Sequence, residues 1–265
     1  MSFLNLENKT FLITGVANKK SVAYFTAKTL LEQKAKCIFS VQSIAHKESV
    51  QKLFPESNIY ICNVEDDKSV EELGNAIKND GHKLSGFVHS IAFANFSEGV
   101  KPFHETKTID FLQATNISCF SLVKMANSLK DLMTPDSSVV TISISNTRAT
   151  SYGYLGPIKA ALDATVAFLA KSFSEFSNIR FNAVCAGPLK TSASSGIPDY
   201  IDNYLYAEQL VMRKKALETQ EVANTIVYLL SPASSGVNAG NIVIDGGMSA
   251  NYFDQKVVKT VSKNL

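Results

Sequence analysis

The 265-residue sequence contains no apolar run long enough to cross a membrane. Its first residues, MSFLNLENK, lack the basic segment and the apolar run of a secretory signal peptide. Lysine and arginine number 26 against 24 aspartates and glutamates, so the net charge is only +2, and no dense basic block is present. These absences argue against nucleic-acid and membrane partners and predict a cytoplasmic protein.

Cysteine is scarce, and the four cysteines occur singly along the chain, at Cys37, Cys62, Cys119 and Cys185. No two of them have the spacing of metal ligands, and each lies in an apolar segment. We therefore expect buried free thiols in a reducing compartment, and no metal site.

Glycine is missing where a dinucleotide-binding loop would carry it. The apolar run Thr10–Thr14 predicts a buried strand that ends at Gly15, and a loop of small residues then leads into a helical pattern. A typical phosphate loop has three glycines, whereas here Ser21 and Ala23 stand where the later ones would be. The strand–loop–helix order still indicates a dinucleotide-binding fold, but this loop alone leaves the assignment open.

The rest of the sequence is that of an ordinary globular protein, 45% hydrophobic and 19% charged, without internal repeats or linkers. Strand and helix patterns alternate, which predicts an α/β fold: a Rossmann-like, doubly wound sheet of about seven parallel strands with helices on both faces. We expect one domain over residues 1–265, with a flap at about 192–214 and a loosely docked or disordered tail at 254–265. The predicted strands are 10–14, 36–41, 58–62, 86–91, 139–143, 179–185 and 240–245; the predicted helices are about 24–31, 46–54, 66–78, one long or two broken helices in 107–133, 160–169 and 218–230.

Tyr152 and Lys159 follow the fifth predicted strand. Ligands of such sheets bind beyond the carboxyl ends of the strands, so both residues should enter the binding crevice. On a helix, their separation of seven residues would place them two turns apart on one face. A lysine beside a phenol lowers the cost of negative charge on the phenol, or on a group bound to it. The pair therefore suits a reaction that needs a proton donor at neutral pH.

Five motifs in this order resemble the short-chain dehydrogenase/reductase superfamily, and more closely its divergent branch, the enoyl-[acyl-carrier-protein] reductases. Most superfamily members have Tyr-x3-Lys and a three-glycine loop, whereas the six-residue gap and the serine-containing loop are typical of the enoyl reductases. The resemblance covers residues 5 to 250 and implies a homotetramer. The motifs are Gly15-Val-Ala-Asn-Lys-x-Ser21-x-Ala23-Tyr24; Gly86-Phe-Val-His-Ser-Ile-x-Phe93-Ala94; Tyr152-x6-Lys159; Ala186-Gly-Pro-x-x-Thr191 with Ala193-x-Ser-Gly-Ile197; and Asp245-Gly-Gly.

The resemblance implies a nicotinamide dinucleotide cofactor. Gln42 is neutral, no arginine follows the second strand, and Lys47 lies five residues on, so we expect NADH rather than NADPH, whose 2′-phosphate needs a nearby cation. The implied cofactor contacts are Gly15, Ser21 and Val22 to the pyrophosphate, Gln42 to the adenosine ribose, Asn63 and Val64 to adenine, Ser90 and Ile91 along the cofactor, Lys159 to the nicotinamide ribose, and Leu189, Lys190, Thr191, Ser192 and Ala193 around the nicotinamide and phosphates.

The implied reaction is hydride transfer to the β-carbon of a trans-2-enoyl thioester in fatty-acid synthesis. The resemblance makes Tyr152 and Lys159 catalytic. The Tyr152 hydroxyl would stabilise the enolate oxygen, and Lys159 would add positive potential in a site shielded from water. The apolar walls of the acyl site would be Phe93, Ala94, Leu155, Ile197 and Tyr200, and the flap would close over them.

Two features depart from the family pattern. The family usually has a second tyrosine after the fifth strand, but here Ser143 is followed by Ile144, in a loop about two residues shorter. The flap segment Ile197–Asn203 has two acids and no base, whereas family members that dock the acidic acyl carrier protein are usually basic there. A CoA thioester, or another small enoyl or carbonyl compound, is therefore an alternative to a carrier-linked substrate.

Two other functions compete with enoyl reduction. A short-chain dehydrogenase acting on another carbonyl or alcohol usually has a serine thirteen residues before the tyrosine, but that position is Val139. A catalytically impaired nucleotide-binding homologue would account for Ile144. His89 lies inside an apolar strand, and we expect it to be a core residue rather than a catalytic one.

Overall fold

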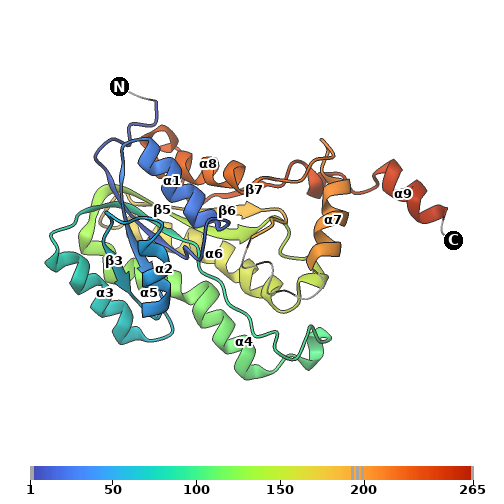
Figure 1. The fold of residues 1–265 in the computed structure, drawn as a ribbon, viewed down its shortest axis with the longest axis horizontal. Coiled ribbons are helices and arrows are strands. Elements are labelled where there is room, and N and C mark those ends of the chain that lie inside the picture. Colours follow the sequence, from blue (N-terminus) through green and yellow to red (C-terminus); the bar gives the residue numbers. More distant parts are fainter. Residues whose placement is uncertain (1–2, 192–193, 195–196, 198–199, 264–265) are drawn as a thin grey trace.

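The computed structural model describes residues 3–191, 194, 197 and 200–263 of the chain. Seven strands form one parallel sheet in the order β3-β2-β1-β4-β5-β6-β7 (Figure 1). The strands are β1 (Thr10–Thr14), β2 (Lys36–Val41), β3 (Ile59–Ile61), β4 (Leu84–His89), β5 (Met133–Ile144), β6 (Arg180–Ala186) and β7 (Asn241–Ile244). The helices are α1 (Val22–Glu32), α2 (Ile44–Gln51), α3 (Asp67–Asn79), α4 (Thr108–Thr115), α5 (Ser121–Leu129), α6 (Leu155–Phe173), α7 (Tyr200–Leu210), α8 (Thr219–Leu230) and α9 (Gln255–Ser262).

The predicted doubly wound sheet is confirmed, and it has a hydrophobic core on each face. Side chains that alternate along a strand point to opposite faces, so Phe11 and Ile13 pack with α1 and α8, while Leu12 packs toward α3, α5 and α6 (Figure 1). Strands buried on both faces are continuous apolar runs, which is why they could be located in the sequence.

Several predicted boundaries differ from the structure, and three of the differences have a visible reason or consequence. β5 begins at Met133, six residues before the predicted start. The prediction missed this first half of the strand because it is polar and partly exposed. The helical pattern in 107–133 is broken by a π-helical turn, Asn116–Phe120, between α4 and α5. The chain end expected to be a loose tail is helical over α9, although no residue of α9 is buried.

Serine and aspartate side chains fix where three helices begin. Ser21 caps α1 by accepting a hydrogen bond from Tyr24 N–H, and Ser43 and Asp66 cap α2 and α3 in the same way. In the described part of the chain, no helix is long and apolar enough to span a membrane.

The ends of β1 and β4 are held together by Thr14 and Gly15. The Thr14 hydroxyl donates to the Val88 carbonyl (2.9 Å) and accepts from Ser90 N–H (3.2 Å). Gly15 has a positive φ of 78°, and a Cβ at this position would lie 1.8 Å from the Ser90 carbonyl oxygen. Only glycine satisfies both the backbone conformation and the close contact.

We predict that Gly15→Ala destabilises the protein far more than Gly81→Ala. Gly81 has a similar φ of 74° but nothing within 4 Å of its would-be Cβ. Its substitution should cost only backbone strain, about 1 kcal/mol. Gly15→Ala adds a backbone clash and should cost about 3 kcal/mol in all. Urea unfolding of both variants measures the difference; equal losses would contradict the close-contact explanation.

Candidate active site

A cavity of about 710 Å³ lies at the carboxyl ends of the strands. Almost all of the described residues predicted to form the site line it: Gly15, Ser21, Val22, Gln42, Asn63, Val64, Ser90, Ile91, Phe93, Ala94, Tyr152, Leu155, Lys159, Leu189, Thr191, Ile197 and Tyr200. Lys190 does not, because its ammonium lies 4.4 Å from the centre of the Tyr204 ring instead. Ser192 and Ala193 fall outside the described residues.

Other lining residues were not identified from the sequence, among them His46, Glu65, Phe96, Gln113 and Ile117. Gln113 and Ile117 come from α4 and the π-helical turn, which a search restricted to strand ends does not reach. The strand-end rule could have found Val16 and Ala17, which follow the predicted residue Gly15.

One end of the cavity is formed by the β1–α1 loop and the first turn of α1. The first turn of α1 contains no acidic residue, so its free N–H groups and the helix dipole favour a bound anion. The Ser21 hydroxyl is held by the Asn18 carbonyl (2.9 Å) and caps the helix. This end has the chemistry of a phosphate site.

Gln42, His46 and Asn63 form the neighbouring part of the cavity. The Asn63 Oδ1 accepts from Glu65 N–H (3.2 Å), which orients the amide. Lys159 is the one lysine or arginine among the described residues that line the cavity. The Gln42 region therefore has no lysine or arginine among the described residues that line the cavity.

Lys159 lies deep in the site, on the first turns of α6, and is only 5% exposed. Its ammonium donates to the Ile142 carbonyl at 2.7 Å. Burial lowers the pKa of Lys159 to about 8, although nearby Asp163 partly opposes this shift. The lysine is thus charged near neutrality and close to losing its proton.

Tyr152 lines the same cavity but is not on the helix that carries Lys159. It ends a short 3₁₀ turn, Thr150–Tyr152; Gly153 follows with a φ of 62°, and α6 begins at Leu155. The expectation that one helix face presents both residues is therefore wrong, although both reach one cavity. Burial, with a smaller contribution from Tyr200, raises the pKa of Tyr152 to about 12, so its hydroxyl stays protonated.

Ile144 also lines the cavity, in the position where the family usually has a tyrosine. Tyr154 does not replace that hydroxyl. Its oxygen accepts from Asn95 N–H (2.7 Å) and donates to the Asn95 carbonyl (3.2 Å), and its ring packs against Phe96. The cavity therefore has an apolar side chain at this position.

The π-helical turn holds the loop after β4 through hydrogen bonds from Ser118. Ser118, fully buried, accepts from Phe93 N–H (2.8 Å) and donates to the Phe93 carbonyl (3.0 Å).

His89, as expected, is a core residue: it is buried between the hydroxyls of Thr141 and Ser121, and burial lowers its pKa to about 3. The histidine is therefore neutral and satisfied.

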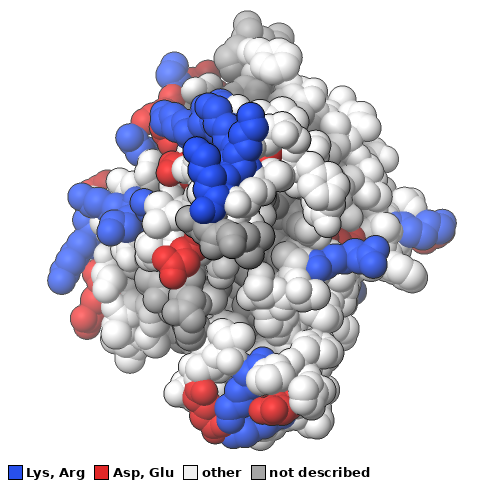
Figure 2. Space-filling view, turned by 90° about the vertical axis from the view of Figure 1, so that its right-hand side faces the viewer, with Lys and Arg blue, Asp and Glu red and all other residues white. Residues whose placement is uncertain are grey.

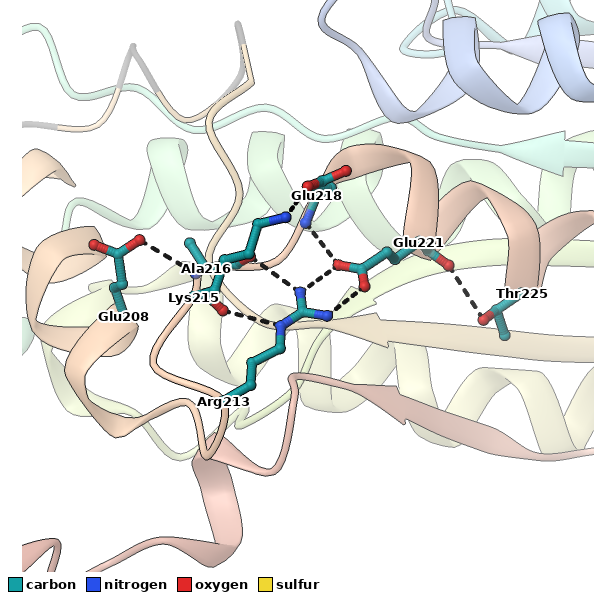
Figure 3. Close-up of polar contacts among 7 residues, drawn as sticks. All are labelled: Glu208, Arg213, Lys215, Ala216, Glu218, Glu221 and Thr225. Atoms are coloured by element: carbon teal, nitrogen blue, oxygen red, sulfur yellow. Dashed lines mark hydrogen bonds and ion pairs between the residues drawn. The ribbon is translucent and has the colours of Figure 1, made fainter.

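α7 borders the cavity, and the loop that follows it is anchored by Arg213 (Figure 3). Arg213 forms a bidentate ion pair with Glu221 of α8, with both N–O distances 2.6 Å. It also donates to the carbonyls of Lys215 and Ala216, while Glu208 of α7 accepts from Ala216 N–H at 3.2 Å (Figure 3). The C-terminal end of the flap is thus tied to the body of the protein.

The four cysteines are free and buried, as expected. Within the described residues, no group of His, Cys, Asp and Glu side chains is arranged to hold a metal ion.

Comparison with known proteins connects this cavity to one family. Residues 15–249 match the family model described as enoyl-(acyl carrier protein) reductase. The enoyl-[acyl-carrier-protein] reductase [NADPH] of Staphylococcus aureus is 36% identical, over 93% of this chain and 99% of that protein. The corresponding [NADH] enzyme of Enterococcus faecalis is 35% identical, over 92% and 98%.

Two solved structures share the fold over nearly their full length. The Bacillus cereus enoyl-acyl carrier protein reductase, with NADP+ and indole naphthyridinone, has a TM-score of 0.87 and 32% identity, covering 91% of this chain and 96% of that one. The enoyl-(acyl-carrier-protein) reductase of Anaplasma phagocytophilum in complex with NAD has a TM-score of 0.86 and 30% identity, covering 92% and 95%.

We predict that Arg213→Met loosens the flap without unfolding the protein. The substitution removes the ion pair to Glu221 and both carbonyl contacts, so amide hydrogen exchange should increase in residues 204–217. Lys171→Met is the control, because it removes an exposed i,i+4 ion pair with Glu175 far from the flap. Unchanged exchange in residues 204–217 of Arg213→Met would show that this cluster does not anchor the flap.

Proposed function

The chain belongs to the enoyl-(acyl carrier protein) reductase family, and from this premise we propose that it catalyses the NADH-dependent reduction of a trans-2-enoyl thioester in fatty-acid synthesis. The observation that carries the proposal is one cavity that joins an anion-binding helix terminus to Tyr152 and the buried Lys159. The relatives reported above are all enoyl reductases, so a dehydrogenase acting on another carbonyl or alcohol, or an inactive homologue, is not favoured.

The residues that line the cavity fit a nicotinamide dinucleotide. Gly15, Ser21 and Val22 would hold the pyrophosphate, where the glycine leaves the backbone accessible and α1 supplies N–H groups. The remaining cofactor contacts would be Gln42, Asn63, Val64, Ser90, Ile91 and Lys159, with Leu189–Ala193 at the nicotinamide end. When bound, the cofactor supplies the hydride.

NADH is favoured because the Gln42 region of the cavity offers no lysine or arginine to a 2′-phosphate among the described residues. The cofactor named for the relatives differs, being NADPH in the Staphylococcus aureus enzyme and NADH in the Enterococcus faecalis enzyme. Within this family, the residues around the adenosine ribose therefore have to decide the choice.

Tyr152 is the proton donor of the proposal. Its raised pKa keeps the hydroxyl intact at neutral pH, so it can donate a hydrogen bond to the thioester oxygen as negative charge develops there. Lys159 places a positive charge in the same buried region and strengthens this stabilisation. Phe93, Ala94, Leu155, Ile197 and Tyr200 would line the acyl site and exclude water.

An acyl carrier protein, or alternatively CoA, would carry the substrate. At the end of the flap, Arg213, Lys214 and Lys215 are each paired with an acid, Glu221, Asp254 and Glu218, so these pairs add little net positive charge for an acidic carrier. Figure 2 shows Lys and Arg side chains gathered at the end of the molecule that carries α7 and α9. Lys256 and Lys259 of α9 and Lys263, which follows it, are exposed, and Asp254 before α9 pairs with Lys214 at the end of the flap. This basic face favours the carrier.

We further propose that residues 1–265 form a single domain with its flap at about 192–214, and that the protein is a cytoplasmic homotetramer. Strands from both ends of the chain belong to one sheet, which supports the single domain. Ile109, Leu112 and Phe168 are 61–78% exposed on α4 and α6, and such apolar surfaces are typical of subunit interfaces. Light scattering gives the mass that tests the tetramer.

The decisive assay follows NADH absorbance with crotonyl-CoA, an enoyl thioester on acyl carrier protein, and a ketone. We expect oxidation of NADH with the thioesters only, and a higher KM with NADPH.

Tyr152→Phe should lower kcat roughly 100-fold or more, because one oxyanion donor is lost, while NADH still binds. Full turnover by Tyr152→Phe would remove Tyr152 from the mechanism. If the wild type binds NADH but turns over none of the substrates, the proposed reductase activity is refuted.

The pH dependence of kcat/KM should report the ionisation of the Lys159 ammonium. Its pKa of about 8 means that the ammonium is charged below that pH and neutral above it. Since the positive charge assists the reaction, kcat/KM should fall as the pH rises through about 8. Tyr152, with a pKa of about 12, cannot cause that fall.

Lys159→Arg is the control for this assignment, because arginine keeps its charge at every pH of the assay. The alkaline fall of kcat/KM should disappear from the residual activity of this variant. If the fall stays near pH 8, another group causes it.

A further inference from the structure

The first residue of α7, Tyr200, is bonded to the nicotinamide end of the cavity. Its hydroxyl accepts from Leu189 N–H at 2.9 Å and donates to the Leu189 carbonyl at 3.0 Å. Both residues line the cavity. One hydroxyl therefore bonds both backbone groups of a single residue, whose carbonyl also accepts from Thr191 N–H at 3.2 Å.

Leu189 has the first backbone N–H of the turn after β6 that is not bonded to another backbone group. Gly187 N–H already pairs with the Ile244 carbonyl at 2.9 Å, and Pro188 has no N–H to offer. A neighbouring N–H and C=O are complementary to a primary carboxamide, which has an NH₂ donor and a carbonyl acceptor. The ring substituent of nicotinamide is such a carboxamide.

We propose that Tyr200 competes with the cofactor carboxamide for the backbone of Leu189, and so sets the affinity for NADH and couples cofactor binding to release of the first turn of α7. This inference rests on the proposed function, because it assumes a nicotinamide cofactor. In the free protein, the first turn of α7 is fastened to the cavity wall. The carboxamide takes both Leu189 groups only when the Tyr200 hydroxyl leaves them.

The apparent affinity for NADH is the intrinsic affinity multiplied by the fraction of molecules in which the Tyr200 hydroxyl has left Leu189. Tyr200→Phe removes the hydroxyl and keeps the ring, so it frees Leu189 at nearly constant volume. We expect the Kd for NADH, measured by the fluorescence of the bound cofactor, to fall on the order of tenfold, the effect of two modest hydrogen bonds.

Two controls make the experiment specific. ADP-ribose lacks the nicotinamide and its carboxamide, so its Kd, measured by calorimetry, should be the same for the wild type and Tyr200→Phe. Tyr206→Phe is the matched variant, because it makes the same change on an exposed residue of the same helix and should leave both affinities unchanged.

The inference is overturned if Tyr200→Phe binds NADH no more tightly than the wild type, or if ADP-ribose gains as much as NADH. The first result would mean that the Leu189 contact does not compete, and the second that the variant merely opens the flap. If the wild type does not bind NADH at all, the proposed function fails, and the inference falls with it. Wild-type binding with no effect of Tyr200→Phe refutes the inference alone.

Discussion

The close approach of β1 and β4 is the constraint on which the site depends. β1 has β2 on one side and β4 on the other, so the strand order reverses there and a crevice opens at their carboxyl ends. The Thr14 hydroxyl joins β1 to the Val88 carbonyl and Ser90 N–H, and Gly15 lets the two backbones touch. Residues from two distant parts of the sequence thereby become adjacent walls of one cavity. A side chain at Gly15 would separate them and displace the start of α1.

Lys159 shows what it costs to place a charge in this cavity. An ammonium that is almost entirely removed from water loses hydration, and the Ile142 carbonyl and nearby Asp163 return only part of it. A residue chosen for stability alone would be apolar at this depth. The same low polarity makes each remaining interaction with a developing negative charge stronger than it would be in water. The burial of the Lys159 charge therefore destabilises the folded protein but favours the proposed reaction.

Much of this arrangement was predictable, because parallel strands are continuous apolar runs and their carboxyl ends must converge. The six-residue gap between Tyr152 and Lys159 was also visible, but its geometry was misread. Gly153 and Pro157 carried the missing signal: proline is well placed in the first turn of a helix, and it opposes a helix that begins much earlier. α6 therefore starts after Tyr152. Lys190 could not be excluded from the sequence, since its direction depends on the ring of Tyr204 across the flap.

The contact between Tyr200 and Leu189 was equally invisible, but the structure repeats its pattern. Three hydroxyls, those of Ser118, Tyr154 and Tyr200, each bond both the N–H and the carbonyl of one loop residue beside the cavity. Ser118 and Tyr154 are buried and hold the loop after β4. Tyr200 differs, because it is only partly buried and it starts the flap helix. The same bonding that fixes the wall at two positions is open to a ligand at the third, which is why Tyr200 is the fastening that a cofactor can displace.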